Sequence, residues 1–490
     1  MSEIFFRPER GWVGDVIPYV DGTSFQLFFL HDMRDEAAPG TSWTRVSTDD
    51  FLTYTDHGVA IAHGGPEDLD LHAYTGSVVE DEGVHHCFYT GYNPAVVDEA
   101  GIPLQWVMHA VSTDGMASWT KIESDTFRAP ATGYEAGDWR DPFVYRAAPD
   151  GPWSMLLAAR TLTGPERRRG VVARLVSDDL TTWTPVEPLW APARYITHEC
   201  PDLFRIGDWW YLVYSEFSEA YTTRYVISRS PEGPWYAPAH DTVDGRGFYA
   251  AKTAARGEER YAFGWIPSRE GGADDGAYQW AGTLAVHQVH QLEDGQLAFA
   301  LPGPVAAAHT DTRRAELDPV VGPWEVGTDG MRVDVRHGAG FASAVTGELP
   351  SSFLCRLTLQ IEEGTHEVGL MLRTSADADH GYQIRLEPHR GRMVFDRWPR
   401  RTTGPLQWQI SGDVPHYVEL ERPVTLDPGT HQLEVLVDGD AFTAYLDATV
   451  AMSGRIYDRP TGGLAVFVAA GAATFDHPVI ATLPSAPHPR

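Results

Sequence analysis

The fold is decided by a short stretch, Ser112-Thr113-Asp114-Gly115-Met116-Ala117-Ser118-Trp119-Thr120, which recurs in degenerate form along the first half of the chain. Each copy follows an apolar run and combines a polar turn with an aromatic residue. The other copies are Ser47-Thr48-Asp49 leading to Tyr54-Thr55, Ser177-Asp178-Asp179 leading to Trp183-Thr184, and Ser228 leading to Trp235. We interpret each copy as the end of a hairpin whose aromatic side chain packs against the neighbouring unit.

The spacing of these copies favours a β-propeller. Their starts are 65, 65 and 51 residues apart, which suits blades of four strands with long loops. Four repeats and a closing blade over about 300 residues predict five blades. The competing explanation is common turn chemistry that recurs by chance.

The rest of the pattern is also typical of an all-β protein. Short runs rich in Val, Ile, Tyr, Phe and Trp alternate with Gly, Asp, Asn and Pro turns, as in Phe25–Leu30, Trp153–Ala158 and Trp209–Tyr214. Few stretches keep a helical period. We expect a five-bladed β-propeller catalytic domain over residues 1–305 and, after a linker rich in Pro, Gly, Ala and charge at 306–322, a supporting domain at 323–490.

The second domain is predicted to be a β-sandwich. His431–Val437 and Phe442–Leu446 alternate on either side of the tight-turn signal Asp438-Gly439-Asp440, which indicates a hairpin. Further strands are expected at Phe353–Ile361, Val368–Arg373, Tyr382–Glu387 and Leu464–Val468. This region has no compact cluster of acids, so we assign it support rather than chemistry.

The composition limits the partners. The 490 residues carry 38 basic and 68 acidic side chains, a formal charge of −30, which repels nucleic acid and anionic membranes. The cysteines Cys87, Cys200 and Cys355 are too few and too scattered for a disulfide framework, and no signal peptide or long apolar run is present. We expect a cytoplasmic protein with a small saccharide substrate; the oligomeric state is left open.

Three acids lie in apolar or aromatic strand contexts. Cleavage of a glycosidic bond needs one acid to protonate the leaving oxygen and one carboxylate to attack or to activate water. A carboxylate buried there without a partner would cost several kcal/mol. The candidates are Asp15 in Gly11–Tyr19, Asp141 in Asp138–Tyr145 and Glu199 in Tyr195–Phe204. The structural alternatives are turn amides around Asp15 and a surface pair of Arg140 with Asp138 or Asp141.

The three candidate acids are separated by 126 and 58 residues, roughly two blades and one blade. Because the innermost strands of a propeller line one cavity, acids in different blades can converge. Strand alternation would send His198 and Cys200 to the face opposite Glu199. No cofactor is implied and no metal site is expected, since the His and Cys residues lack ligand spacing.

These motifs together resemble glycoside hydrolase family 32, which includes invertases, inulinases and levanases. Arg140-Asp141-Pro142 matches the family's R-D-P motif, and Glu199-Cys200 matches its E-C motif. Trp12-Val13-Gly14-Asp15-Val16 resembles its nucleophile motif W-M-N-D-P-N-G. Further similar stretches are Tyr74-Thr75-Gly76-Ser77, Phe248-Tyr249-Ala250, Gly264-Trp265 and Trp280-Ala281-Gly282-Thr283-Leu284.

The resemblance implies a retaining β-fructofuranosidase on a five-bladed propeller with a C-terminal β-sandwich. Asp15 would be the nucleophile, Glu199 the acid/base, and Asp141 a transition-state stabiliser that holds sugar hydroxyls. Substrate contacts would come from Trp12, Gly14, Tyr74, Thr75, Ser77, Arg140, Trp265 and Trp280. Each aromatic residue among them has a second explanation, a place in the core.

Departures from the family motifs keep other functions open. Gly14 replaces the Asn before the nucleophile, Val16 replaces the Pro after it, and Val286-His287-Gln288 replaces an expected Pro-Arg. The alternatives are a fructosyltransferase, or a hydrolase of another furanoside such as an arabinofuranoside. An alternative of another class is a carbohydrate-binding protein without turnover.

Overall fold

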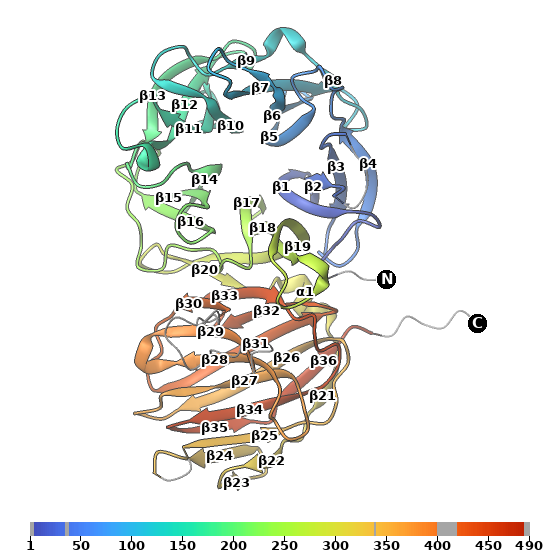
Figure 1. Cartoon of the computed structure of the whole chain (residues 1–490), viewed down its shortest axis with the longest axis vertical. Helices are drawn as coiled ribbons and strands as arrows, with labels where there is room; N and C mark the ends of the chain where they lie inside the picture. Colours follow the sequence, from blue (N-terminus) through green and yellow to red (C-terminus); the bar gives the residue numbers. More distant parts are fainter. Residues whose placement is uncertain (1–3, 35–38, 338–339, 399–418, 485–490) are drawn as a thin grey trace, which may run out of the picture. The chain divides into compact units, whose positions relative to one another are not determined.

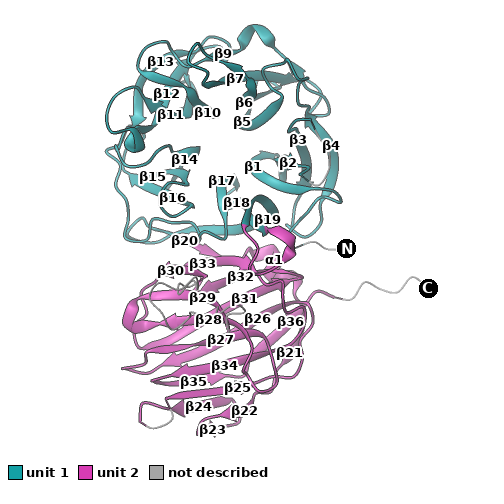
Figure 2. Ribbon diagram, in the orientation of Figure 1, with its two compact units in different colours: residues 1–268, 278–298 teal, residues 269–277, 299–490 magenta. Residues whose placement is uncertain are grey.

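The structure is a computed structural model that describes residues 4–34, 39–337, 340–398 and 419–484. These residues form 36 strands and a single short α-helix, so the all-β prediction is confirmed. The chain divides into two compact units (Figure 2), residues 1–268 with 278–298, and residues 269–277 with 299–490. No helix among the described residues is long and apolar enough to cross a bilayer.

Unit 1 contains four antiparallel sheets. The strands of its first and last parts share one sheet, ordered β17-β18-β19-β1-β2-β3-β4, because β1 pairs with β19. The other sheets are β5-β6-β7-β8, β10-β11-β12-β13 and β14-β15-β16. The strands are β1 (Trp12–Asp21), β2 (Ser24–Asp32), β3 (Trp43–Thr48), β4 (Thr55–Ile61), β5 (His72–Asp81), β6 (Val84–Val97), β7 (Pro103–Ser112), β8 (Thr120–Lys121), β9 (Phe127–Arg128), β10 (Tyr134–Arg146), β11 (Trp153–Thr161), β12 (Gly170–Ser177), β13 (Thr184–Trp190), β14 (Glu199–Ile206), β15 (Trp209–Glu216), β16 (Thr222–Ser228), β17 (Tyr249–Arg256), β18 (Glu259–Arg269), β19 (Tyr278–Gln291) and β20 (Leu297–Ala300).

The inner strands of unit 1 follow one another around a common centre. Figure 1 shows β1, β5, β10, β14 and β17 at the inner edge of this unit. Each contacts the next, and β17 contacts β1 again, which closes the circle. These five strands therefore surround the same central space.

Neighbouring sheets of unit 1 are held by apolar clusters between their faces. One cluster joins Phe28 and Trp43 to Tyr89, and the next joins Phe88 to Trp139 and Met155. This burial on both faces explains why β2 is buried at six consecutive positions, Phe25–Leu30, rather than at alternate ones.

The repeated turn works as the sequence predicts. Trp119 packs edge-on against Phe28 of the preceding sheet with 6.0 Å between ring centroids, and Trp183 packs against Phe88 at 5.5 Å. In the turn itself a carboxylate accepts backbone N–H groups, as Asp179 does from Thr181 and Thr182. The prediction that the aromatic side chain contacts the neighbouring unit is confirmed at these two positions.

Unit 2 is built from two sheets that share one apolar core, the arrangement of a β-sandwich. One sheet has the order β23-β24-β35-β26-β31-β32-β33 with β21 and β36 beside it, and the other has the order β22-β25-β34-β27-β28-β29-β30. The elements are α1 (Gly303–Ala308), β21 (Asp311–Arg314), β22 (Asp318–Val321), β23 (Glu325–Val326), β24 (Gly330–Asp334), β25 (Phe341–Val345), β26 (Ser352–Ile361), β27 (Glu367–Thr374), β28 (Gly381–Glu387), β29 (Arg392–Trp398), β30 (Leu420–Pro423), β31 (Gly429–Asp438), β32 (Ala441–Leu446), β33 (Val450–Arg455), β34 (Gly463–Ala469), β35 (Ala472–Asp476) and β36 (Val479–Thr482).

The segment expected to be a linker, residues 306–322, differs from that expectation. It contains β21 and β22, which pair with β36 and β25 of unit 2. Both strands are exposed along their whole length, and their pairing comes from backbone groups. Because no side-chain pattern marks such strands, the polar composition conceals them.

Candidate active site

The inner strands of unit 1 share a local irregularity that aims side chains at the centre. Each of the five carries a shift of register, as produced by a β-bulge, and a bulge turns a side chain away from its regular direction. The shifts lie between Val13 and Val16 in β1, Tyr74 and Gly76 in β5, Arg140 and Phe143 in β10, Glu199 and Asp202 in β14, and Tyr249 and Lys252 in β17. Asp15, Thr75 and Asp141 lie inside these shifts, and Glu199 and Tyr249 begin theirs.

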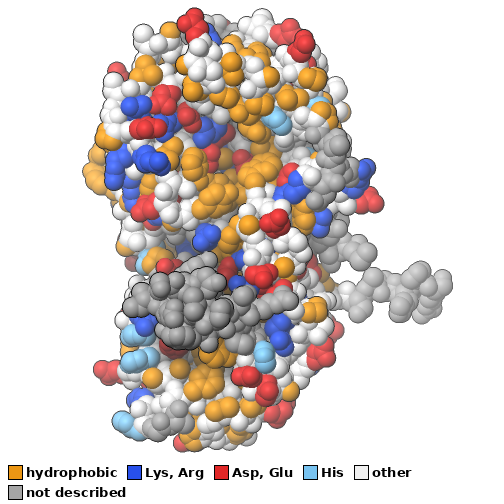
Figure 3. Space-filling view, viewed as in Figure 1, with side chains coloured by type: hydrophobic (Ala, Val, Ile, Leu, Met, Phe, Trp, Pro, Cys, Tyr) orange, Lys and Arg blue, Asp and Glu red, His pale blue; other side chains and the backbone are white. Residues whose placement is uncertain are grey.

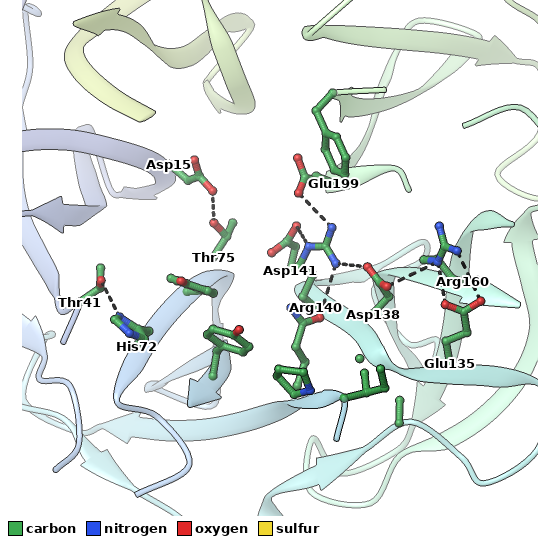
Figure 4. A pocket seen from close by; sticks show the side chains of 18 of the residues that line it. Asp15, Thr41, His72, Thr75, Glu135, Asp138, Arg140, Asp141, Arg160 and Glu199 are labelled. Atoms are coloured by element: carbon green, nitrogen blue, oxygen red, sulfur yellow. Dashed lines mark hydrogen bonds and ion pairs between the residues drawn. The ribbon is translucent and has the colours of Figure 1, made fainter. Parts of the chain in front are cut away.

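The three candidate acids line one cavity of about 1140 Å³. Figure 4 shows Asp15 with Thr75 beside it on one side of the cavity, and Asp141 and Glu199 on the other. The acids come from β1, β10 and β14. Their convergence, which the sequence predicts from the spacing alone, is observed.

Asp15 is held by three donors in the wall of the cavity. The Thr75 hydroxyl donates to its Oδ2 at 2.6 Å, and the Trp265 Nε1–H donates to its Oδ1 at 3.1 Å. The Cys200 thiol lies 3.7 Å from Oδ2. Burial raises the pKa of Asp15, and the hydrogen bond from Thr75 opposes that rise. The donors fix the direction of the carboxylate and leave it close to the other acids.

Asp141 is the most deeply buried of the three acids. Its side chain accepts the Cys200 backbone N–H at 2.9 Å, and its own N–H donates to the Thr90 hydroxyl at 2.8 Å. Its φ of 60° lies in the left-handed region, which costs free energy for a residue other than glycine. Burial raises the pKa of Asp141, while the neighbouring Arg140 lowers it. The surrounding structure thus stabilises an unfavourable backbone at this acid.

Glu199 accepts hydrogen bonds on both carboxylate oxygens. Arg140 Nη2 lies 3.0 Å from Oε1, and the Tyr249 hydroxyl lies 2.7 Å from Oε2. Burial raises the pKa of Glu199 against the opposing charge of Arg140, and the nearby Asp141 raises it further. A carboxyl group with a raised pKa can stay protonated nearer to neutral pH, which a general acid requires.

The two residues beside Glu199 differ from each other. His198 is fully buried beside the rings of Trp190 and Tyr214, away from the acids, as strand alternation predicts. Cys200 departs from that prediction, because the register shift after Glu199 directs its N–H to Asp141 and its thiol toward Asp15.

The remaining predicted contacts fall into two groups. Tyr74, Thr75, Arg140 and Trp280 line the cavity. Trp12, Gly14, Ser77 and Trp265 are absent from its lining among the described residues.

The four residues outside the lining have other contacts in the structure. The Ser77 hydroxyl accepts the Val144 N–H at 2.9 Å, and fully buried Trp265 donates to Asp15 while its ring packs against Tyr249 and Trp280. The guanidinium carbon of Arg7 lies over the Trp12 ring, 3.5 Å from the ring centroid. Gly14 lies beneath the Trp280 ring, where a Cβ would come within 2.6 Å of a ring carbon.

Comparison with known proteins identifies the family. The model of the glycosyl hydrolases family 32 N-terminal domain matches residues 5–300. The chain belongs to glycoside hydrolase family 32.

Relatives of this family 32 chain include sucrose-6-phosphate hydrolase of Escherichia coli, 27% identical over 312 residues that cover 59% of this chain and 62% of that protein. Another is the levanbiose-producing levanase of Bacillus subtilis strain 168, 28% identical over 259 residues that cover 50% of this chain and 44% of that protein. The matched part therefore spans less than two thirds of either relative.

Solved structures share the fold of this family 32 chain over nearly its whole length. Sucrose-6-phosphate hydrolase from Lactobacillus gasseri superposes with a TM-score of 0.72 at 20% identity, covering 99% of this chain and 93% of that one. Exo-inulinase from Aspergillus awamori gives 0.71 at 18% identity, with 99% and 98% covered.

The structure adds site residues that the sequence does not single out. Tyr249 belongs to a motif already quoted, and its position at the bulge of β17, equivalent to that of Glu199 in β14, marks it as a partner of the acids. Glu135, Arg160 and Arg169 form an ion-paired wall with Asp138. The sequence gives only a weak indication of these three residues, because charged residues beside a turn are usually solvated. The alternative that pairs Arg140 with Asp138 also holds, at 2.7 Å, but in the cavity wall and not on an open surface.

No group of three His, Cys, Asp or Glu side chains suited to a metal ion occurs in the part of the chain that the structure describes.

Proposed function

We propose that this protein is a retaining β-fructofuranosidase that releases terminal fructose from small saccharides. The observation that carries the proposal is the meeting of Asp15 and Glu199 in one cavity, where each carboxylate is held by donors and burial raises the pKa of Glu199 as a general acid requires. Membership of family 32 supports the same reaction. The relatives are named for sucrose 6-phosphate and for levan, so they leave open whether the substrate carries phosphate.

Asp15 is the proposed nucleophile and Glu199 the proposed acid/base. The Asp15 carboxylate attacks the anomeric C2 while Glu199 gives its proton to the glycosidic oxygen, so the C2–O bond breaks and the alcohol leaves. Glu199 then takes a proton from water, whose oxygen attacks C2 and displaces Asp15. Fructose is released, and both carboxyl groups return to their first state.

Asp141 is the proposed stabiliser of the transition state. Its rigid backbone and its bond from Cys200 leave it as a fixed acceptor for sugar hydroxyls. Such hydrogen bonds accelerate the reaction only where they strengthen as the ring flattens toward an oxocarbenium ion. Arg140 orients Glu199 and, through its positive charge, favours return of that group to its ionised form.

The proposed scaffold is a five-bladed β-propeller. Its blades would be β1–β4, β5–β9, β10–β13, β14–β16 and β17–β20. Support comes from the cyclic contacts of the inner strands and from the register shift that recurs in each of them. Unit 2 is proposed to support this domain. The three free cysteines, all buried, favour a cytoplasmic location.

The test is hydrolysis of sucrose, short inulin and levan oligomers, and aryl arabinofuranosides by the wild type, Asp15→Asn and Glu199→Gln. We expect fructose from the wild type and a loss of about 10³-fold or more in both variants. Asp208→Asn, at an exposed side chain, serves as the control and should keep full activity. With methanol present, retention gives methyl β-fructofuranoside.

Each other outcome leads to a different function. Cleavage of the arabinofuranoside alone would assign another furanoside, and products longer than the substrate would assign a transferase. Failure to cleave any of these sugars would overturn the proposal and favour a binding protein.

A further inference from the structure

The charge of the cavity is strongly one-sided. Its described lining holds eight carboxylates and three guanidinium groups, and no lysine. Three of the acids are those assigned to the chemistry. The other five, the outer carboxylates, are Asp32, Asp98, Glu135, Asp138 and Glu166, and three of these, Asp32, Glu135 and Asp138, form ion pairs with arginines. Because carboxylates outnumber guanidinium groups in this lining, a ligand with its own negative charge meets net repulsion in the cavity.

The three guanidinium groups of the lining already form hydrogen-bonded ion pairs with carboxylates. Arg140 bonds Asp138 at 2.7 Å and Glu199 at 3.0 Å. Arg160 and Arg169 both bond Glu135, at 2.8 and 2.9 Å.

These contacts leave little of the arginine charge for a ligand. Arg160 also donates to two carbonyl oxygens, and its side chain is only 8% exposed, against 12% for Arg140. Even Arg169, with a side-chain exposure of 26%, shares its charge with Glu135. A phosphate group would have to break these pairs to gain a bidentate partner.

Four exposed apolar side chains also line the cavity. Ile102, Leu162, Phe217 and Trp280 line it with 50, 49, 42 and 38% of their surface exposed. Figure 3 shows hydrophobic side chains around the hollow of unit 1, with basic and acidic side chains intermixed on the side of β10–β13. Such side chains suit the C–H faces of a neutral sugar, whereas a phosphate placed against them loses hydration without compensation.

We propose that this site selects unphosphorylated saccharides, and that Glu135 is a specificity-determining residue because it neutralises Arg160 and Arg169. The inference rests on the proposed function and adds the substrate class to it. A phosphate carries a charge of about −1.5 to −2 at pH 7. Each outer carboxylate within about 8 Å of it would lower the affinity roughly two- to fivefold in water.

The experiment compares kcat/KM for sucrose and for sucrose 6-phosphate in the wild type, Glu135→Gln and Glu166→Gln. We expect the wild type to prefer sucrose by about tenfold or more. Glu135→Gln removes the carboxylate that Arg160 and Arg169 share, while Asp138 still pairs with Arg160, and should reduce this preference by about fivefold, with a smaller reduction in Glu166→Gln. Raising the salt from about 20 to 200 mM should also reduce it. Glu258→Gln, in the exposed turn after β17, should leave the ratio unchanged.

Equal or higher kcat/KM for sucrose 6-phosphate in the wild type would overturn the inference, as would an unchanged ratio in both cavity variants with unaltered melting temperatures. Glu166→Gln keeps the test open if Glu135→Gln folds poorly, because the Glu166 side chain is exposed. Calorimetric titration of both sugars into the same proteins gives the ratio of their dissociation constants even without turnover. Loss of all hydrolysis would then count against the proposed function alone.

Discussion

The hydroxyl of Tyr249 donates a hydrogen bond to Oε2 of Glu199, and the two oxygen atoms lie 2.7 Å apart. The bond joins the start of β17 to the start of β14, so neighbouring groups of strands share it. A donor of this kind stabilises the ionised carboxylate and lowers its pKa, in opposition to burial. Tyr249 therefore sets how readily Glu199 gives up a proton and takes it back.

Tyr249→Phe removes that donor without removing the ring. The pKa of Glu199, already raised by burial, should rise further, so the alkaline limb of the kcat/KM profile should move to higher pH. The activity at the optimum should fall roughly tenfold, because the glutamate becomes a weaker base in the second step. The measurement is a pH profile of sucrose hydrolysis between about pH 4 and 9.

Tyr236→Phe is a matched control, because Tyr236 is 60% exposed. Its profile should coincide with that of the wild type. A profile for Tyr249→Phe that keeps its limbs and loses only amplitude would contradict a role in tuning Glu199, and would leave Tyr249 a packing residue.

Asp15→Asn should stabilise the fold while it abolishes activity. Since the pKa of Asp15 is raised in the folded protein, the folded state binds its proton more tightly than the unfolded state does. The resulting stability is complete at low pH and is lost as the pH rises through the folded pKa, a loss that Asn avoids. The Asn amide can donate to the Thr75 hydroxyl while its oxygen accepts from Trp265, so the hydrogen bonds survive.

The check is calorimetry of wild type and Asp15→Asn at about pH 4 and pH 7.5. The variant should melt about 2–4 °C higher at the upper pH for each kcal/mol relieved, with the difference shrinking at the lower pH. An equal or lower melting temperature at pH 7.5 would show that the carboxylate is not a source of strain. Asp208→Asn tests whether removal of any acid from so acidic a chain has the same effect.

The class of the fold and the three candidate acids can be predicted from the sequence because each produces a recognisable pattern within a short stretch of residues. The turn around Trp119 and the strands of the β31–β32 hairpin are local features, governed by neighbours in the chain. Asp15, Asp141 and Glu199 are conspicuous because acids among apolar residues need a reason. The linker prediction at 306–322 fails for the opposite cause, since exposed strands held by backbone pairing carry no apolar pattern.

What the sequence cannot supply is the register between strands. The shift in β14 turns Cys200 toward Asp15 and Asp141, although plain alternation sends it away. Trp265 shows the same limit, because it is both a core residue and a donor to Asp15, two explanations that the sequence presents as alternatives. Such roles depend on pairing between distant segments.

Gly14 and Trp280 are expected to be energetically coupled. A Cβ on Gly14 would lie 2.6 and 2.7 Å from two carbons of the Trp280 ring and 2.9 Å from the Leu30 carbonyl oxygen. Gly14→Ala should therefore destabilise the protein by about 1–3 kcal/mol, since a rigid ring and a backbone atom must move. It should also lower kcat/KM, because Trp280 lines the cavity beside Asp15.

The double variant Gly14→Ala/Trp280→Ala separates the ring from the backbone. Removal of the ring eliminates two of the three close contacts, so the double variant should lose less stability than the two single variants together, by about 0.5 kcal/mol or more. The remaining contact with Leu30 keeps the recovery partial. Gly347→Ala, where an added Cβ meets nothing within 4 Å, gives the cost of the Gly to Ala change alone. Additive losses in urea denaturation would mean that Trp280 moves aside freely, and that the glycine does not determine where the ring lies in the cavity.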